Sequence, residues 1–513
     1  MGTLIVNPGW PTLLKGGIAA AGALVLFLSW LAHRKGCLDR WRPLRDGLLL
    51  ALGLTAGLCW WNLGGFREAG YVHVWDTFHY YMGGKYFREL GYERLYLCSA
   101  LADAEDGFLD AGARRRIRDL ASNTLVPAVS ALTDPERCRS HFSPERWSAF
   151  KQDVAWFRAR VSPRIWAAAQ GDHGYNGSPA WGVLGTLLAS TGPASTPQIL
   201  ALTLVDPALL LAMWAAVAWA FGWRVMCVAL IYWGTNFAAG FSWQGGAYLR
   251  QDWLVATIVG LCLLRRGWTA AGGAALATAT LLRVFPGLAL AGVLLQAIAG
   301  RIRAAAPPPR GERRFVSGVL VAVAVLLPVS VVVAGSASAW AAFVSNSAKL
   351  AGTPLTNHMG LKTVVAFDPA TRASVSAPLN LELDPFAVWK DARRRTFAER
   401  RWGWIGLVAA FAVLLAVAAR GRPVWVAAVL GVGLIPVATE LTCYYYSVLL
   451  AYGLLWREED LIGAGLAALA AVTCMIPAVT SWDDVRYTAM SAAVLIFVVA
   501  ATAFHAVRTP RVY

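Results

Sequence analysis

The residues best suited to chemistry follow an early apolar run, in the segment Tyr71-Val-His-Val-Trp-Asp-Thr-Phe-His-Tyr-Tyr-Met-Gly-Gly-Lys-Tyr-Phe-Arg88. It places a single carboxylate, Asp76, among aromatic side chains, with His79 and Tyr80 close by. A positioned carboxylate can act as a general base that takes the proton of a hydroxyl group. The alternative interpretation is an interfacial belt of Trp and Tyr that contains one incidental acid.

Three further groups of polar residues stand at the ends of apolar runs. Ionisable groups at membrane depth are costly, so they are functional candidates by default. Each group also has a structural explanation, namely a turn ion pair, an arginine that reaches the interface, or belt tyrosines. Asp206, before Pro207, also lies in an apolar run, and we assign it only a helix kink. The three groups are Arg250-Gln251-Asp252, Arg283, and Glu440 with Tyr444, Tyr445 and Tyr446.

A polar segment at 346–362 adds amides, a histidine and two lysines. Cations of this kind suit a phosphate group, because charge-assisted hydrogen bonds are the strongest ones. A carboxylate opposite them suits deprotonation of an acceptor hydroxyl as a phosphate leaves. The residues are Asn346, Lys349, Asn357, His358 and Lys362.

The composition indicates a polytopic membrane protein. Of the 513 residues, 57% are hydrophobic and only 15% are charged, whereas soluble domains carry roughly 25% charged residues. The formal charge of +16 comes mainly from short bursts between apolar runs, which is typical of orientation signals and argues against nucleic-acid binding. No Cys-x-x-Cys pair is present, so no metal site is indicated. No cofactor is firmly implied, and metal dependence stays open.

Apolar run lengths and the positive-inside rule predict about thirteen transmembrane helices with the N-terminus outside and the C-terminus inside. Short basic segments at 33–45, 265–266, 301–314 and 420–422 are assigned to the cytoplasm. The apolar segment 178–190 is too short to span and is predicted to be an interfacial or re-entrant helix. The predicted regions are two N-terminal helices (1–61), a large outer region (62–195), transmembrane helices (196–334), a second outer region (335–402), and C-terminal helices with a tail (403–513).

Two features of the outer regions stay open. Cys98 and Cys138 lie in the large polar segment, where they pair if it faces an oxidising compartment and otherwise remain free thiols. The basic cluster within 390–401 falls outside the cytoplasm in this topology. A long loop is exempt from the charge rule; otherwise a span is missing from the count, or these cations meet an anionic ligand.

Four motifs follow one another along the chain. They are Asp76-Thr-Phe-His-Tyr80-Tyr81 with Gly91-Tyr-Glu-Arg-Leu95-Tyr96, then Arg250-Gln251-Asp252 with Arg265-Arg266-Gly267, then Arg283-Val-Phe-Pro286-Gly287, then Tyr444-Tyr445-Tyr446. In this order they resemble polyprenol-phosphate-dependent GT-C glycosyltransferases, most closely the branch (family 87) that includes mycobacterial mannosyltransferases of phosphatidylinositol mannoside synthesis. The resemblance runs over most of the chain from Asp76 to Trp456. The departures are Arg for Lys at 283, Asp for Asn at 252, an extra N-terminal span and an enlarged outer loop.

The resemblance implies that Asp76 is the general base, that Arg283 contacts the donor phosphate, and that transfer inverts the anomeric carbon without a nucleotide. We expect the donor phosphate to meet Arg250, Arg283, Lys349 and Lys362. We expect the substrates to meet His79, Tyr80, Gln251, Asn357, His358, Tyr444 and Tyr445.

The fold expected is therefore an all-α polytopic membrane protein, a GT-C type bundle with two outer regions that carry short interfacial helices. The expected function is transfer of a mannose, another hexose or a pentose from a polyprenyl phosphate to a glycolipid or glycan acceptor. The active site would lie on the outer face of a bacterial cytoplasmic membrane. A transporter or flippase for a lipid-linked anionic substrate is the alternative, although such a path needs polar groups at mid-membrane as well.

Overall fold

The computed structural model of the chain describes residues 9–66, 70–109, 115–301, 310–377, 384–457 and 460–508. These residues are largely helical, and the strands among them form two small antiparallel sheets. In one sheet β1 (Arg116–Asp119) pairs with β2 (Thr124–Pro127), and in the other β3 (His358–Met359) pairs with β4 (Leu441–Thr442). The predicted all-α class is confirmed.

Six helical stretches are long and apolar enough to cross a membrane, which makes the chain a multi-pass membrane protein by length and composition. A seventh is the bent pair of α13 (Trp223–Thr235) and residues 237–244, which contain η2 (Phe237–Ala239) and α14 (Phe241–Gln244) and turn by 77°. The six are α1 (Trp10–Arg34), α11 (Thr196–Thr203) with α12 (Val205–Phe221), α18 (Arg310–Ala334), α22 (Ala387–Ala419), α25 (Asp460–Val479) and α26 (Asp483–Val507).

The remaining predicted spans coincide with helices that do not meet the length and hydropathy needed to cross a membrane alone. Short helices fit at membrane depth where neighbouring protein satisfies and shields the backbone. The count of thirteen therefore stays a prediction. These helices are α2 (Leu38–Trp60), α15 (Asp252–Arg265), α16 (Thr269–Leu282), α17 (Gly287–Arg301), α23 (Val424–Val432) with α24 (Leu434–Ala438), and the 3₁₀ helix η5 (Cys443–Arg457).

Two predicted loops are shorter in the structure. The basic segment 33–45 is mostly part of α2, because α1 ends in a tight turn in which Gly36 has φ +68° and Cys37 N donates to Ala32 O. The span predicted to start at Gly403 belongs to α22, which begins at Ala387. Residues 387–402 contain no glycine or proline and many strong helix formers, so nothing interrupts the helix. The basic cluster at 390–401 therefore lies on a helix.

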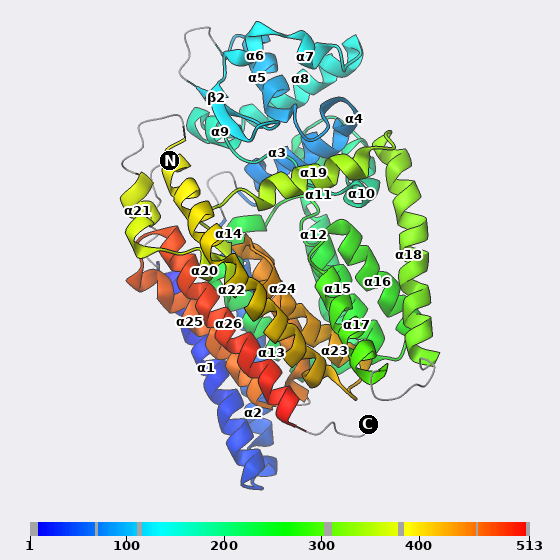
Figure 1. Ribbon diagram of the computed structural model, residues 1–513, viewed down its shortest axis with the longest axis vertical. Coiled ribbons are helices and arrows are strands. Elements are labelled where there is room, and N and C mark those ends of the chain that lie inside the picture. Colours follow the sequence, from blue (N-terminus) through cyan, green and yellow to red (C-terminus); the bar gives the residue numbers. More distant parts are fainter. Residues whose placement is uncertain are drawn as a thin grey trace.

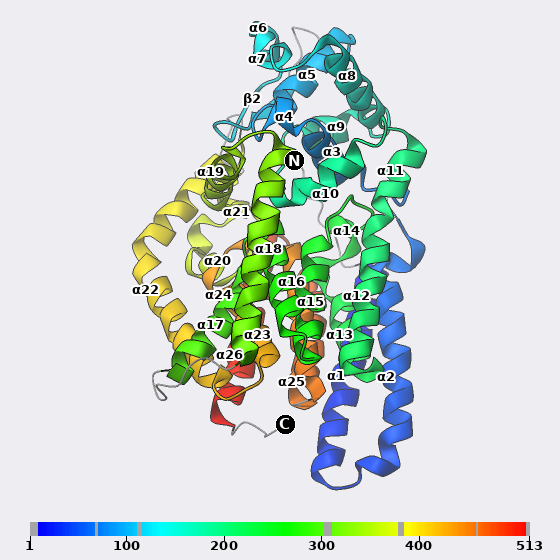
Figure 2. The same cartoon turned by 90° about the vertical axis from the view of Figure 1, so that its right-hand side faces the viewer.

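The helices of the large outer region form a cap over one end of the bundle (Figures 1 and 2). The turn between α1 and α2, the start of α18 and the end of α26 lie at the opposite end (Figure 1). Residues 302–309 of the basic stretch 301–314 and residues 509–513 are outside the described part. The outer region contains η1 (Asn62–Gly64), α3 (Val74–Lys85), α4 (Phe87–Leu90), α5 (Leu95–Glu105), α6 (Ser130–Thr133), α7 (Glu136–Arg139), α8 (Pro144–Arg158), α9 (Pro163–Ala169) and α10 (Pro179–Ala189).

The helix predicted at 178–190 is α10, which Ser178 caps by accepting a hydrogen bond from Trp181 N at 3.1 Å. It packs against α3 of the cap and α18 of the bundle. The second outer region supplies α19 (Ala339–Ala351), α20 (Leu361–Val365), η3 (Pro369–Thr371) and α21 (Ala373–Ser376).

Cys98 of α5 and Cys138 of α7 form a disulfide inside the cap, with Cα atoms 5.4 Å apart. The other cysteines of the described chain are free, and most of them are buried. Buried side chains form two clusters, one in the bundle and one in the cap. Tyr248 and Leu249 belong to the cap cluster although they directly precede α15 of the bundle. The turn that contains them therefore sits at the seam between the two parts.

Candidate active site

The first element of the site is the N-terminal end of α3. His73 is the N-cap, and its Nδ1 lies 3.5 Å from the backbone N of Asp76. Asp76 and Tyr80 are four residues apart, so they lie on one face of the helix. His73 N also donates to Gly246 O at 2.7 Å, which ties this helix end to the turn before α15. Gly246 has φ +70°, and a Cβ there would lie 1.9 Å from Tyr71 O, so only glycine fits.

The second element is the turn that presents Arg250. Leu249 has φ +49°, a left-handed conformation that is costly for a leucine and persists only where the surroundings enforce it. Trp181 Nε1 donates to Leu249 O at 2.9 Å. The two carboxylate oxygens of Asp206 accept from Arg250 N at 2.8 Å and from Gln251 N at 3.2 Å. Asp206 thus holds this turn, a role beyond the kink expected from sequence.

Asp76 and Arg250 meet at the junction of these two elements. Asp76 Oδ2 lies 2.9 Å from Arg250 Nε, and the two side chains are 17% and 3% exposed. Neither atom has an aligned hydrogen-bond partner among the described residues, so the contact is a close ion pair rather than a directed hydrogen bond. The partly exposed carboxylate of Asp76 therefore faces the buried guanidinium of Arg250.

Tyr80 lies between Arg250 and Arg283. Arg250 Cζ is 4.0 Å from the centroid of the Tyr80 ring, and Arg283 Cζ is 5.3 Å from it. The Tyr80 hydroxyl accepts from Arg283 Nη2 at 2.8 Å and donates to Asn176 Oδ1. Asn176 also accepts from Arg283 Nη1 through its backbone oxygen at 3.0 Å. The positive charges of Arg250 and Arg283 are therefore held near one another. The Tyr80 ring contacts both, and Asn176, near the end of the large outer region, binds Arg283.

Both arginines carry nitrogen atoms that are buried without a hydrogen-bond partner in the described part of the chain. These are Arg250 Nη1 and Nε and Arg283 Nε. Burying a charged donor without a partner is costly. Arginine N–H groups match the oxygens of a carboxylate or phosphate, so this arrangement can bind an anion that contacts both guanidinium groups.

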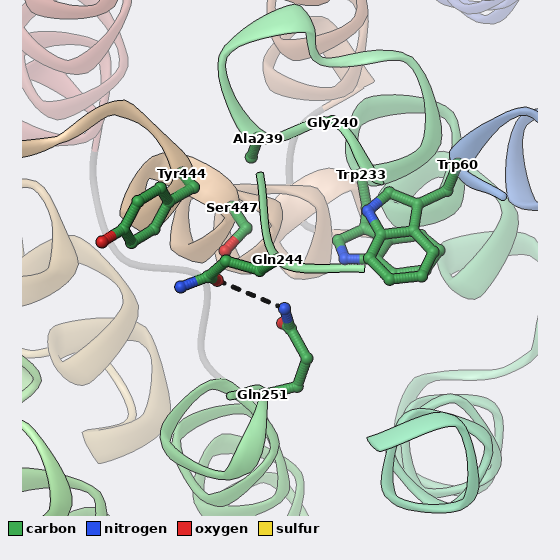
Figure 3. Close-up of a pocket in the computed structure, with 8 residues that line it drawn as sticks. All are labelled: Trp60, Trp233, Ala239, Gly240, Gln244, Gln251, Tyr444 and Ser447. Carbon is green, nitrogen blue, oxygen red and sulfur yellow. Dashed lines mark hydrogen bonds between the residues drawn. The ribbon is translucent and has the colours of Figure 1, made fainter. Parts of the chain in front are cut away.

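A small pocket is lined in part by Gln251, the residue that follows Arg250 in the chain (Figure 3). Gln251 Nε2 donates to Gln244 Oε1 at 3.3 Å, and Gln244 Nε2 is buried without a partner among the described residues. The Tyr444 ring centroid is 5.8 Å from Arg250 Cζ, which links the pocket to the ion pair. The pocket is lined by Trp60, Trp233, Ala239, Gly240, Gln244, Gln251, Tyr444 and Ser447.

Tyr445, next to Tyr444 in the chain, packs against aromatic side chains near Arg250 and Arg283. Its ring centroid lies 4.8 Å from that of Phe285 and 5.5 Å from that of Trp253. The ring of Tyr444 lies 4.6 Å from that of Tyr445. The structure thus brings Asp76, Tyr80, Arg250, Arg283, Gln251, Tyr444 and Tyr445 into one neighbourhood.

The other candidates make contacts elsewhere. His79 is buried in the cap, where Nε2 lies 2.6 Å from Tyr96 Oη and 3.2 Å from Ala169 O. Lys349 Nζ donates to Leu120 O of the cap. Asn357 O accepts from Cys443 N at 3.0 Å, which closes the small β3–β4 ladder. These contacts do not connect them to Arg250 or Arg283.

Lys362 and His358 belong to a second charged cluster, centred on Glu440. Glu440 lies 2.9 Å from Lys362 Nζ and 3.1 Å from Arg393 Nη2. Burial would raise the pKa of Glu440, but His358, which is protonated in the acid range where Glu440 titrates, and the cations Lys362 and Arg393 bring it down to about 2. Burial lowers the pKa of His358 to about 4, so its imidazole is neutral at pH 7. Glu440 thus forms ion pairs with Lys362 and Arg393, so Lys362 already has an anionic partner within the chain.

Four cations of the basic cluster at 390–401 likewise have partners. Lys390 pairs with Asp384 at 2.6 Å and Arg394 pairs with Asp391, and Arg400 donates to two backbone oxygens at and just after the end of α20. Arg393 is the residue that reaches Glu440. These cations therefore have acidic or backbone partners in the chain itself.

Sequence reasoning missed Asp206 and Asn176. An aspartate before proline inside an apolar run was a usable signal for Asp206. Nothing around Asn176 in the sequence marks its contact with Arg283. Comparison of the chain with protein-family models, curated proteins and solved structures found no match.

Proposed function

We propose that the chain is an inverting membrane glycosyltransferase of the GT-C type that transfers a sugar from a polyprenyl phosphate to a hydroxyl acceptor. The observation that carries this proposal is the Asp76 carboxylate beside two buried arginines, at the seam between cap and bundle. A carboxylate next to an anion site is what direct displacement of a phosphate by a hydroxyl needs. The arginines lie near the ends of α15 and α16, where a lipid-borne donor would present its phosphate.

The reaction is a single displacement. The acceptor oxygen forms a bond to the anomeric carbon while the bond from that carbon to the phosphate oxygen breaks. The electron pair leaves with the polyprenyl phosphate, which Arg250 and Arg283 stabilise. The acceptor proton goes to Asp76. The sugar is a mannose, another hexose or a pentose, and the acceptor is a glycolipid or glycan.

We place the site on the outer face of a bacterial cytoplasmic membrane, in a bundle of about thirteen spans. Two observations support this orientation. The cap contains the Cys98–Cys138 disulfide, and disulfides persist in oxidising compartments. The basic pairs Arg265-Arg266 and Arg420-Gly-Arg422 stand at the C-terminal ends of α15 and α22, away from the cap, as the positive-inside rule requires.

The decisive experiment is transfer of radiolabelled sugars from a panel of polyprenyl monophosphate sugars by the purified protein in nanodiscs. We expect product with one of these donors, and a loss of about 100-fold or more in Asp76→Asn, because general bases contribute 10² to 10⁴. Asp391→Asn is the matched control, since Asp391 forms an exposed ion pair with Arg394.

Unchanged transfer by Asp76→Asn would remove Asp76 as the base. The transporter would be favoured if the protein transfers sugar from no donor but, reconstituted in lipid vesicles, moves the lipid-linked sugar from one leaflet to the other.

A further inference from the structure

We propose that Asp76 and a phosphate group compete for the Arg250 guanidinium, so that a phosphate-bearing lipid detaches Asp76 and frees it for the acceptor hydroxyl. This inference deepens the proposed function and rests on it. It makes donor binding a condition for an available base, and it links the two substrates through one arginine.

The Arg250 guanidinium already contacts an aromatic ring and a carboxylate. The centroid of the Tyr80 ring lies 4.0 Å from Arg250 Cζ. Anions contact this group in its plane, where the N–H bonds point. Asp76 Oδ2 lies 2.9 Å from Nε, although it is not aligned with the N–H bond. A phosphate that engages Arg250 through Nε and a terminal N–H group therefore has to take the space beside Nε that Asp76 now occupies.

The contact between Asp76 and Arg250 is suited to exchange. The carboxylate touches Arg250 without an aligned hydrogen bond, and Nη1 has no partner among the described residues. A phosphate can form directed, charge-assisted hydrogen bonds to these nitrogens, which are stronger than a misaligned contact. Since a buried arginine without an anion is costly, replacement of one anion by another is favoured over simple opening of the pair.

Arg283 favours the phosphate over the carboxylate. Its Nη1 and Nη2 are fixed by Asn176 and Tyr80, and its Nε is buried without a partner in the described chain. The same Tyr80 side chain contacts both arginines. A phosphate with several oxygens can reach both guanidinium groups, whereas the structure pairs Asp76 with Arg250 alone.

The Asp76 side chain is partly exposed. It is 17% exposed, against 3% for Arg250, so the carboxylate is the more open member of the pair. It stands in the first turn of α3, where the positive end of the helix stabilises an anion even without the arginine. The detached carboxylate stays close to the phosphate, where an acceptor hydroxyl has to be placed.

The test is equilibrium binding of polyprenyl monophosphate to the purified protein in nanodiscs, which requires no catalysis. If Asp76 competes with the phosphate, Asp76→Asn binds this lipid on the order of tenfold more tightly than the wild type. Arg250→Gln binds it more weakly than the wild type. Neutral polyprenol serves as the lipid without phosphate, and its binding is unchanged in both variants.

Asp391→Asn is the matched control, because it removes the same charge from the exposed Asp391–Arg394 pair. Equal affinity of Asp76→Asn and wild type, or an equal gain in Asp391→Asn, would overturn the exchange. Thermal unfolding shows whether each variant is folded, and Asp76→Ala replaces Asp76→Asn if the latter is not.

Inorganic phosphate alone distinguishes the two sources of this chemistry. If Asp76→Asn also binds inorganic phosphate more tightly than the wild type, the phosphate group suffices for the exchange. If only its affinity for the lipid rises, the exchange needs the attached chain.

The experiments also distinguish the exchange from the proposed function. If Asp76→Asn binds the lipid more tightly and the wild type transfers sugar from no donor, the exchange stands and the glycosyltransferase is removed. If the wild type transfers sugar and Asp76→Asn does not bind the lipid more tightly, the glycosyltransferase stands and the exchange is removed.

Discussion

At the scale of single residues, the site depends on how two arginines are kept close together. Tyr80 is 2% exposed and lies against both guanidinium groups, so it acts as a positioning residue for Arg250 and Arg283. Its hydroxyl joins Arg283 to Asn176, while its ring faces Arg250. The two parts of the side chain therefore have separable functions.

Removal of the hydroxyl alone should affect Arg283 and leave Arg250 in place. In Tyr80→Phe we expect about tenfold weaker binding of polyprenyl phosphate, because a hydrogen bond to a charged group contributes roughly 1.5–3 kcal/mol. Tyr80→Leu, which also loses the ring beside Arg250, should bind still more weakly. Tyr86→Phe is the control, since it removes a hydroxyl that donates to Asp153 at 2.8 Å inside the cap. Equal affinity of Tyr80→Phe and wild type would contradict this assignment.

His358 makes the stability of the fold sensitive to acid. Burial lowers its pKa to about 4, against 6.5 for an ordinary histidine. Between these values the unfolded chain binds a proton that the folded chain does not, so stability falls as the pH decreases. At pH 5 this histidine reduces the free energy of unfolding by about 2 kcal/mol relative to pH 7.5.

The measurement is thermal unfolding in detergent at pH 7.5 and pH 5. His358→Asn should lose less stability on acidification than the wild type, and His33→Asn, at an exposed position, should behave like the wild type. The same loss in His358→Asn as in the wild type would remove His358 as the titrating group.

At the scale of elements, the position of Arg250 depends on a strained turn. Leu249 adopts φ +49°, and the chain holds it there with Trp181 of α10 and Asp206 of α12. Asp206 lies one residue before Pro207 near the start of α12, so its carboxylate can meet the two backbone N–H groups that precede α15. The position of Arg250 is thus set by contacts from two other helices.

Substitution of Asp206 should displace Arg250. Asp206→Asn keeps one acceptor oxygen and turns an N–H group toward the second backbone donor, which should cost roughly 1–3 kcal/mol of stability. We expect weaker binding of polyprenyl phosphate together with a lower unfolding temperature. In the cap, Asp153 accepts from Ala194 N at 2.7 Å, and Asp153→Asn should lower stability without changing lipid binding. Identical binding losses in the two variants would refute a specific role for Asp206.

At the scale of the whole molecule, the cap and the basic turns lie at opposite ends of the bundle (Figure 1). This arrangement gives the protein two chemically different faces, one with a disulfide and one with short basic turns. The candidate site lies toward the cap, so its orientation decides from which side the acceptor comes.

Cys37 provides a direct test of orientation. It is an exposed free cysteine in the turn between α1 and α2, at the end opposite the cap. We expect a membrane-impermeant maleimide to label it in inverted vesicles and not in intact cells. Cys37→Ser, which lacks this thiol, gives the background. Labelling in intact cells and not in inverted vesicles would place the cap in the cytoplasm.

Much of the helical architecture followed from the sequence, because apolar run lengths and basic turns report the environment of each helix directly. The expected helices at 11–32, 178–190, 253–264, 268–282, 286–299 and 461–479 each coincide with a helix of the structure. The start of α22 could not be found in this way, since hydropathy drops at its charged first half although helix propensity does not.

The sequence by itself determined which residue types were available at the seam, namely one carboxylate in the 71–88 segment and arginines at the ends of two apolar runs. The tertiary structure decided which of them meet. It paired Asp76 with Arg250 and gave Lys362 to Glu440 and Lys349 to Leu120. Partners separated by more than a hundred residues, such as Tyr80 and Arg283, are selected by packing between helices, and local spacing along the chain carries no record of that packing.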